Sequence, residues 1–136
     1  MPILIKKLDP SLTGPRKGVG VQIPFSSDSV FITNYSSEEA MKNNILHYLL
    51  TERGECYLNI ERGFNLYGYL FEQNVEKTRQ EISRDIESRL KSRFPRLSKV
   101  EVETNTGIDE HTLQILLKYR IEYSEKDSEV VLNIER

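Results

Sequence analysis

The chain has 136 residues with 19 basic and 21 acidic side chains, which gives a net charge of −2 at pH 7. This length fits one domain with a buried core of its own, and the lack of a basic excess argues against a general nucleic-acid or membrane-surface binder. The single cysteine cannot form an internal disulfide, so folding in a reducing cytoplasm is expected.

The N-terminal part is punctuated by glycine and proline. Residues 1–18 are expected to form an extended arm, because Asp-Pro and Gly-Pro pairs interrupt regular structure. Residues 19–136 are expected to form a single domain. Alternating apolar residues over 19–23 predict a short edge strand, and residues 30–32 are expected to pair back with it as a hairpin.

Three helices are expected in the middle of the chain. The first begins at Ser36, whose spacing to Glu39 is that of a capping box, and Gly54 is its expected stop. A short second helix is expected over 65–72 and a third over 75–93, a stretch without Gly or Pro. The apolar face of the second helix is predicted to hold Leu66, Leu70 and Phe71, and that of the third Val75, Ile82, Ile86 and Leu90.

The last third of the chain alternates with period two, which predicts strands over 100–102, 112–123 and 130–134, with a turn opening at 105–107. Twelve residues of strand extend roughly 40 Å at ~3.3 Å each, whereas the expected radius of gyration is about 14 Å. We therefore expect an α+β fold, with two to three helices packed on a small antiparallel sheet and a long C-terminal β-hairpin whose far end can project as a ribbon.

The residues offer little for catalysis or metal binding. His47 and His111 are far apart and have no Cys or acid at zinc-ligand spacing, and Cys56 has no His nearby to activate it. We expect no metal, no cofactor and no enzyme activity.

One acidic cluster leaves open the alternative that the protein is an enzyme. Glu52, Glu55 and Glu61 are candidates for the two carboxylates of a glycoside hydrolase. Arg53 and Arg62 lie within a few residues of them, and nearby cations favour the ionised form of a carboxylate, the wrong state for a general acid. A peptidoglycan hydrolase is therefore the weaker hypothesis.

The order of short motifs is similar to that of the baseplate wedge family of contractile phage tails, which also occurs in type VI secretion and related injection particles. The resemblance spans residues 18–134. It rests on Ile23-Pro24-Phe25, on Leu49-Leu50-Thr51-Glu52-Arg53-Gly54-Glu55, on Gly63, Leu66 and Leu70-Phe71, on Phe94-Pro95-Arg96, and on the alternating C-terminal strands. Cys56, Ile60, Arg62 and Phe94 depart from the family's pattern.

The resemblance implies that the protein is a structural component of a particle. Such a protein sits in the baseplate around the inner tube or hub, in six-fold copies, joins wedge proteins, and templates sheath subunits with its C-terminal hairpin; its particle is assembled in the bacterial cytoplasm. The residues implied in sheath binding by strand addition are Glu129, Val130, Val131, Leu132, Asn133 and Ile134. Those implied in wedge binding are Pro95, Arg96, Glu55 and Gly63.

The final strand also supports a second alternative from the residues alone. It is expected to be an unpaired sheet edge that carries Val130, Val131 and Leu132, and soluble proteins usually protect such edges. An unprotected edge can add to another chain's sheet. A stand-alone binding module that captures a peptide strand therefore remains open beside the baseplate subunit.

Overall fold

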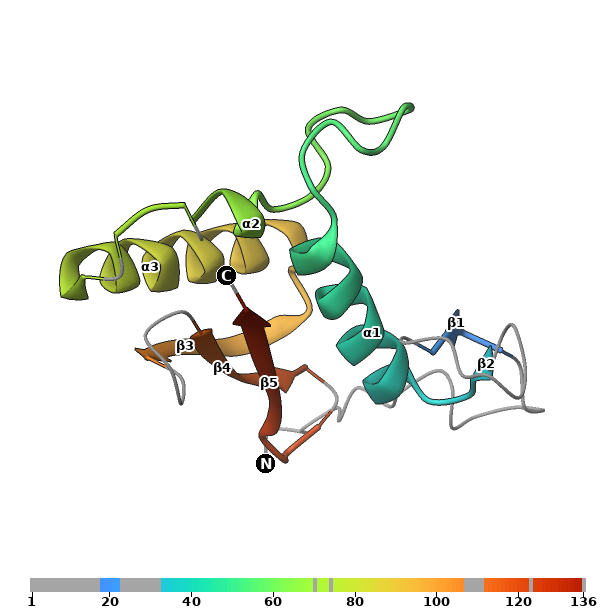
Figure 1. Cartoon of the computed structure of the whole chain (residues 1–136). Helices are drawn as coiled ribbons and strands as arrows, with labels where there is room; N and C mark the ends of the chain where they lie inside the picture. The colour runs from blue at the N-terminus through green and yellow to red at the C-terminus, as the bar shows by residue number, and fades with distance from the viewer. Residues whose placement is uncertain are drawn as a thin grey trace. The chain divides into compact units, whose positions relative to one another are not determined.

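The computed structural model describes residues 18–22, 33–69, 71–73, 75–106, 112–122 and 124–135. The chain separates into two units, Met1–Tyr48 and Leu49–Arg136. The described residues form three helices and two antiparallel sheets, which confirms the α+β class (Figure 1). Apart from Gly18, the expected N-terminal arm lies outside the described residues, and so do residues 23–32 with the expected return strand at 30–32.

The first unit contains a small hairpin and most of the first helix. Strand β1 (Gly20–Val21) pairs antiparallel with β2 (Thr33–Asn34), so the chain does pair back on the predicted edge strand. Helix α1 (Ser37–Leu50) follows directly. Its start is capped as predicted, because the backbone N–H of Glu39 donates to Ser36 Oγ over 3.2 Å. The helix ends at Leu50, before the expected stop at Gly54.

In the second unit, α2 (Leu66–Tyr69) is shorter than predicted and α3 (Glu76–Arg93) agrees to within one residue. Ile82, Ile86 and Leu90 are buried as expected. Val75 is not part of their stripe: it is 48% exposed, because it caps the helix with extended backbone instead of continuing the helical rotation. Phe71 lies beyond α2 and is 85% exposed, so its predicted place on the apolar face is wrong; Leu70 lies outside the described residues.

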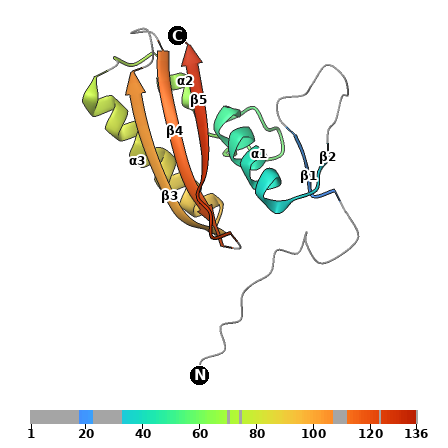
Figure 2. The same cartoon turned by 90° about the horizontal axis from the view of Figure 1, so that it is seen from below.

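The C-terminal sheet has the strand order β3-β4-β5 and is antiparallel throughout. Its strands are β3 (Leu97–Thr106), β4 (Thr112–Ile121) and β5 (Ser128–Glu135). The predicted alternation in β4 is confirmed: its buried residues are Leu113, Ile115, Leu117, Tyr119 and Ile121. Helix α3 runs along this sheet, and the two elements bury their apolar residues together (Figure 2).

Strand β3 is longer than the sequence indicates. Asn105 and Thr106, which were expected to open a turn, belong to β3 and pair with Gln114 and Leu113 of β4. Strand β4 is therefore paired along its whole length, with β3 from Leu97 to Thr106 on one side and with β5 on the other. The C-terminal hairpin is long, but it lies within the three-stranded sheet and does not extend beyond it as a free ribbon.

Candidate functional site

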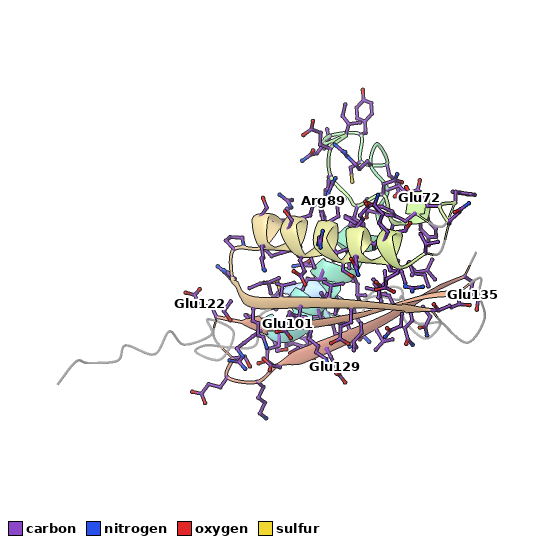
Figure 3. All side chains as sticks on the ribbon, turned by 90° about the vertical axis from the view of Figure 1, so that its left-hand side faces the viewer. Glu72, Arg89, Glu101, Glu122, Glu129 and Glu135 are labelled. Carbon is purple, nitrogen blue, oxygen red and sulfur yellow. The ribbon has the colours of Figure 1, made fainter. Side chains whose placement is uncertain are left out.

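All six residues predicted to bind sheath lie in β5, at one edge of the sheet. Val130 and Ile134 point into the core, whereas Glu129 and Asn133 are exposed and Val131 is 51% exposed. Figure 3 labels Glu129 and Glu135 near the two ends of this strand. Within the described part of the chain, β5 makes backbone hydrogen bonds only to β4.

At the opposite edge of the sheet, α3 contacts β3. The backbone N–H of Val102 in β3 donates to Glu87 Oε1 of α3 over 3.1 Å. Thr104 Oγ1 donates to the backbone oxygen of Arg79 over 3.0 Å, and Arg79 Nη1 donates to Thr106 Oγ1 over 3.0 Å. The outward-facing N–H of Val102 is thus bonded to α3, and the Thr104 and Thr106 side chains are tied to the helix, beside an open pocket of about 440 Å³ between the two elements. An added strand would have to displace these contacts to pair with β3.

The bond between Val102 and Glu87 also shows which backbone groups of β5 point outward. In an antiparallel sheet, the N–H and C=O of one residue point to the same side, and neighbouring residues alternate. Since the Val102 N–H points away from β4, its partner Leu117 turns its own groups toward β5. Leu117 pairs with Val130, so the backbone groups of Val130 face β4 and those of Glu129, Val131 and Asn133 face outward.

Two of the predicted wedge-binding residues shape a loop, residues 51–64, between α1 and α2. Glu55 Oε2 accepts the backbone N–H of Glu52 over 3.0 Å. Gly63 has φ +109°, and a Cβ there would collide with the carbonyl oxygen of Thr51 and come within 2.9 Å of that of Glu52. The adjacent N–H of Phe64 donates to the Thr51 oxygen over 2.9 Å. Glu55 and Gly63 thus hold together the two ends of this loop, which we call its neck.

The other two, Pro95 and Arg96, lie in the exposed turn between α3 and β3. The turn is held from both sides: the N–H of Leu97 donates to Phe94 O over 3.0 Å, and the N–H of Glu122 donates to Arg96 O over 2.9 Å. The structure therefore places the four predicted wedge residues in two separate segments, the loop and this turn.

A polar cavity of about 280 Å³ lies between the loop base, α2 and α3. Tyr69 donates its hydroxyl to Asp85 Oδ2 over 2.7 Å, and Arg89 Nε lies 3.7 Å from the same oxygen. The Arg89 guanidinium also sits 5.4 Å from the centre of the buried Phe64 ring. Burial and the hydrogen bond to Asp85 raise the pKa of Tyr69 to about 12. The cavity groups pair with one another and fasten the loop base to α3.

The acids considered for hydrolysis do not converge on this cavity. Glu52, Glu55 and Glu61 are exposed on the loop and none of them lines it. Among the described residues, no group of His, Cys, Asp and Glu is arranged to hold a metal ion. No described helix is long and apolar enough to cross a membrane.

The exposed apolar residues at the outer end of the loop are not predicted from the sequence. Tyr57, Leu58 and Ile60 are large, apolar and exposed, and the structure places them side by side in the chain at this end. The signal available in the sequence was an apolar run between Gly54 and Gly63, outside any helical or strand period. We call residues 57–60 the loop tip.

Comparison with known proteins gives a consistent result. The family model described as "Baseplate wedge protein gp25" matches residues 35–126. The baseplate wedge protein gp25 of Enterobacteria phage T4 is 28% identical over 82 residues, which is 60% of this chain and 62% of the phage protein. The match thus spans less than two thirds of that relative.

Two solved structures share the fold. A protein from Geobacter sulfurreducens described as a tail lysozyme is 23% identical, with a TM-score of 0.66 over 74% of this chain and 91% of that one. A chain of the baseplate complex from the type VI secretion system is 17% identical, with a TM-score of 0.56 over 70% and 89% of the two chains. At these identities the likeness shows the fold alone.

Proposed function

Because this chain belongs to the baseplate wedge protein gp25 family, we propose that it is a structural subunit that links wedge proteins around the inner tube and templates the sheath through β5. The matched relative and one of the solved structures come from a phage and a type VI secretion baseplate. Assembly in the bacterial cytoplasm and six-fold copies in the particle are part of the same proposal.

The asymmetry of the sheet edges is the observation that carries the sheath role. The outer edge of β3 is bonded to α3 through Glu87 and Arg79, whereas the described backbone bonds of β5 run only to β4. An incoming strand therefore has fewer contacts to displace at β5 than at β3. Pairing along eight residues would add about eight hydrogen bonds at roughly 0.5–1.5 kcal/mol each, which is enough to hold a subunit in place.

The side chains of β5 fit such an added strand. Val130 and Ile134 face the core, and an added strand with apolar residues at alternate positions would extend that buried face. Val131 offers an apolar contact on the other face. A one-residue slip would exchange the two faces of the added strand, so this pattern also specifies the register of the sheath strand.

Proline tests this proposal cleanly, because it removes a backbone N–H. Val131→Pro and Asn133→Pro together remove two outward donors and leave the N–H groups that face β4 in place, and proline is tolerated in edge strands at such positions. We expect the double variant to fold, to enter the baseplate and to fail to start the sheath. Val131→Thr with Asn133→Thr keeps both donors and is the matched control. Normal sheath on the proline variant, seen by electron microscopy, would refute the template role.

For wedge contacts we propose the exposed turn at Pro95 and Arg96. The turn is rigid, since its backbone is bonded to Phe94 on one side and Glu122 on the other, and a rigid exposed turn loses little entropy on binding. Glu55 and Gly63 are proposed to act through the loop that they close. The test is Arg96→Ala in reconstituted baseplates, which should weaken the association of this chain with wedge proteins; Lys91→Ala, at an exposed position on α3, is the control.

A further inference from the structure

We infer that the loop tip is a preformed apolar knob that inserts into an apolar pocket on a different protein of the baseplate. The inference rests on the proposed baseplate role and deepens it, because it assigns the contact proposed for the loop that Glu55 and Gly63 close to the apolar residues at its tip. Figure 1 shows the loop extending away from α2 and α3.

The exposure of the loop tip is unusual for side chains of this kind. Tyr57 and Leu58 are each 96% exposed, and Ile60 is 68% exposed. Single apolar side chains on a surface are ordinary, but several large ones at one projecting point mark an interaction site. Burying a side chain of this size gains about 1.5–3 kcal/mol, so the tip holds binding energy that the described fold does not use.

The loop is held in one shape by its own backbone. The N–H of Gly54 donates to Ile60 O over 2.8 Å, and the N–H of Asn59 donates to Cys56 O over 3.1 Å. At the base, Phe64 is buried, stacks on Tyr69 with ring centres 5.9 Å apart, and lies under Arg89. In Figure 3 Arg89 lies on the side of α3 that faces away from the sheet. A loop ordered before binding loses less entropy when it docks.

A second copy of this chain is a poor occupant, because the tip is too small. A buried aromatic side chain removes about 150–250 Å² from water. Three tip residues and their three equivalents would bury about 900–1,500 Å² at this value, which is an upper bound because only Tyr57 among them is aromatic, so two tips alone reach at most the lower part of the ~1,200–2,000 Å² that stable interfaces bury. The tip is suited to add one anchored contact to a larger interface, in which a pocket surrounds the side chains.

The charges around the tip favour a protein over a lipid surface. Glu52, Glu55 and Glu61 are interspersed with Arg53 and Arg62, so the rim has mixed sign and a slight acidic excess. Attraction to anionic lipid headgroups requires a cluster of basic residues. An apolar centre with a tyrosine, surrounded by a polar rim of both signs, is the usual composition of a protein interface. The occupant is therefore an apolar pocket with charged groups at its edge.

The occupant can be identified by crosslinking from the tip in the full particle. Leu58 is replaced by the photoreactive residue p-benzoylphenylalanine, particles are purified and irradiated, and the crosslinked chains are identified by mass spectrometry. We expect a crosslink to one other baseplate protein. The same residue placed at Lys77, an exposed position on α3, should not give that product. A crosslink only to a second copy, a crosslink to lipid, or no crosslink would overturn the inference.

A second measurement separates binding from folding. Leu58→Asp should leave the melting temperature unchanged, because Leu58 is almost fully exposed, and should lower the amount of this chain in purified baseplates by at least about tenfold, the penalty for a charge in an apolar pocket. Leu58→Met is the matched control and should incorporate normally. Equal incorporation of both variants would overturn the inference.

The two proposals fail in different ways. If the chain is present in particles and the sheath depends on β5, but position 58 gives no crosslink to another protein, only the loop inference fails. If the wild-type chain is missing from purified particles, the baseplate role itself fails. The Val131→Pro, Asn133→Pro variant should retain the crosslink from position 58, because the edge strand and the loop tip act independently.

Discussion

The hydroxyl of Tyr69 donates to Asp85 Oδ2 over 2.7 Å, and this bond joins the four-residue α2 to the long α3. A helix of one turn has almost no stability of its own. Its position depends on the buried Leu66 and on this bond, and the base of the projecting loop depends in turn on Phe64, which stacks on the Tyr69 ring. The bond therefore contributes to the orientation of the loop.

Removing the hydroxyl should loosen α2 without unfolding the protein. Tyr69→Phe keeps the stacking on Phe64 and leaves Asp85 beside Arg89. We expect a loss of about 1 kcal/mol in the free energy of unfolding, the usual net value of a part-buried hydrogen bond, measured by urea denaturation. Tyr67→Phe, at an exposed position on the same helix, should change stability by less. Equal effects of the two substitutions would contradict this role.

The same bond predicts a dependence on alkaline pH. The pKa of Tyr69 is raised from 10.0 to about 12 in the folded protein, by burial first and then by the bond to Asp85. The folded state therefore holds this proton more tightly than the unfolded state. The resulting stabilisation is complete below about pH 10 and is lost as the pH rises toward 12. Thermal melts of Tyr69→Phe should fall less steeply than wild type across this interval; parallel curves would contradict the prediction.

The apolar stripe of α3 allows a matched test of burial. Ile86 is fully buried, whereas Val75, which the sequence pattern places on the same stripe, caps the helix and is half exposed. Ile86→Ala should cost about 2–5 kcal/mol, because it removes buried methyl groups and leaves a cavity. Val75→Ala should cost less than about 0.5 kcal/mol. Denaturation midpoints of the two variants check this order, and similar midpoints would show that the stripe extends to Val75.

Strands with one face in the core can be predicted from the sequence, because burial on one side makes apolar residues alternate with polar ones. Strand β4 has five buried residues in strict alternation, and it was predicted nearly to its ends. The end of β3 was missed for the opposite reason. Thr104 and Thr106 are polar, and they are held in the strand by bonds to Arg79 of α3 as well as by pairing with β4. A contact between distant side chains leaves no periodic trace in the sequence.

The loop tip could not be predicted from patterns of burial. Those patterns assume that Tyr57, Leu58 and Ile60 seek the core, whereas the structure exposes them. Strand β5 could be predicted, because residues 130–134 alternate between apolar and polar side chains in the sequence. Which of its N–H groups point outward follows from its register with β4 and from the direction of the Val102 N–H, which are contacts between elements that leave no pattern in the sequence.

Opening the edge of β3 should be possible by removing its cover. Glu87→Ala leaves the Val102 N–H without its acceptor, so amide exchange at Val102 should accelerate and the free energy of unfolding should fall by about 1 kcal/mol. Glu87→Gln keeps an acceptor oxygen at the same reach and should retain most of the protection. Hydrogen exchange followed by NMR gives the readout. Unchanged exchange at Val102 in the alanine variant would show that Glu87 does not protect this N–H.

The two glycines of the loop provide the last test, because they share a backbone conformation and differ in surroundings. Gly54 has φ +92° with open space around it, whereas Gly63 has φ +109° and lies against the carbonyl groups of Thr51 and Glu52. An alanine at either position is strained by about 1–2 kcal/mol. At position 63 it must also push apart the two ends of the loop, which breaks the bond from the Phe64 N–H to Thr51.

Gly63→Ala should therefore cost at least about 3 kcal/mol, and limited proteolysis should cut its loop faster than in Gly54→Ala. Since the tip depends on the neck for its position, Gly63→Ala should also reduce incorporation into baseplates while the core, followed by amide exchange in β4, remains protected. Gly54→Ala should incorporate more efficiently than Gly63→Ala. The reverse order of stability would mean that the close approach at Thr51 does not hold the loop.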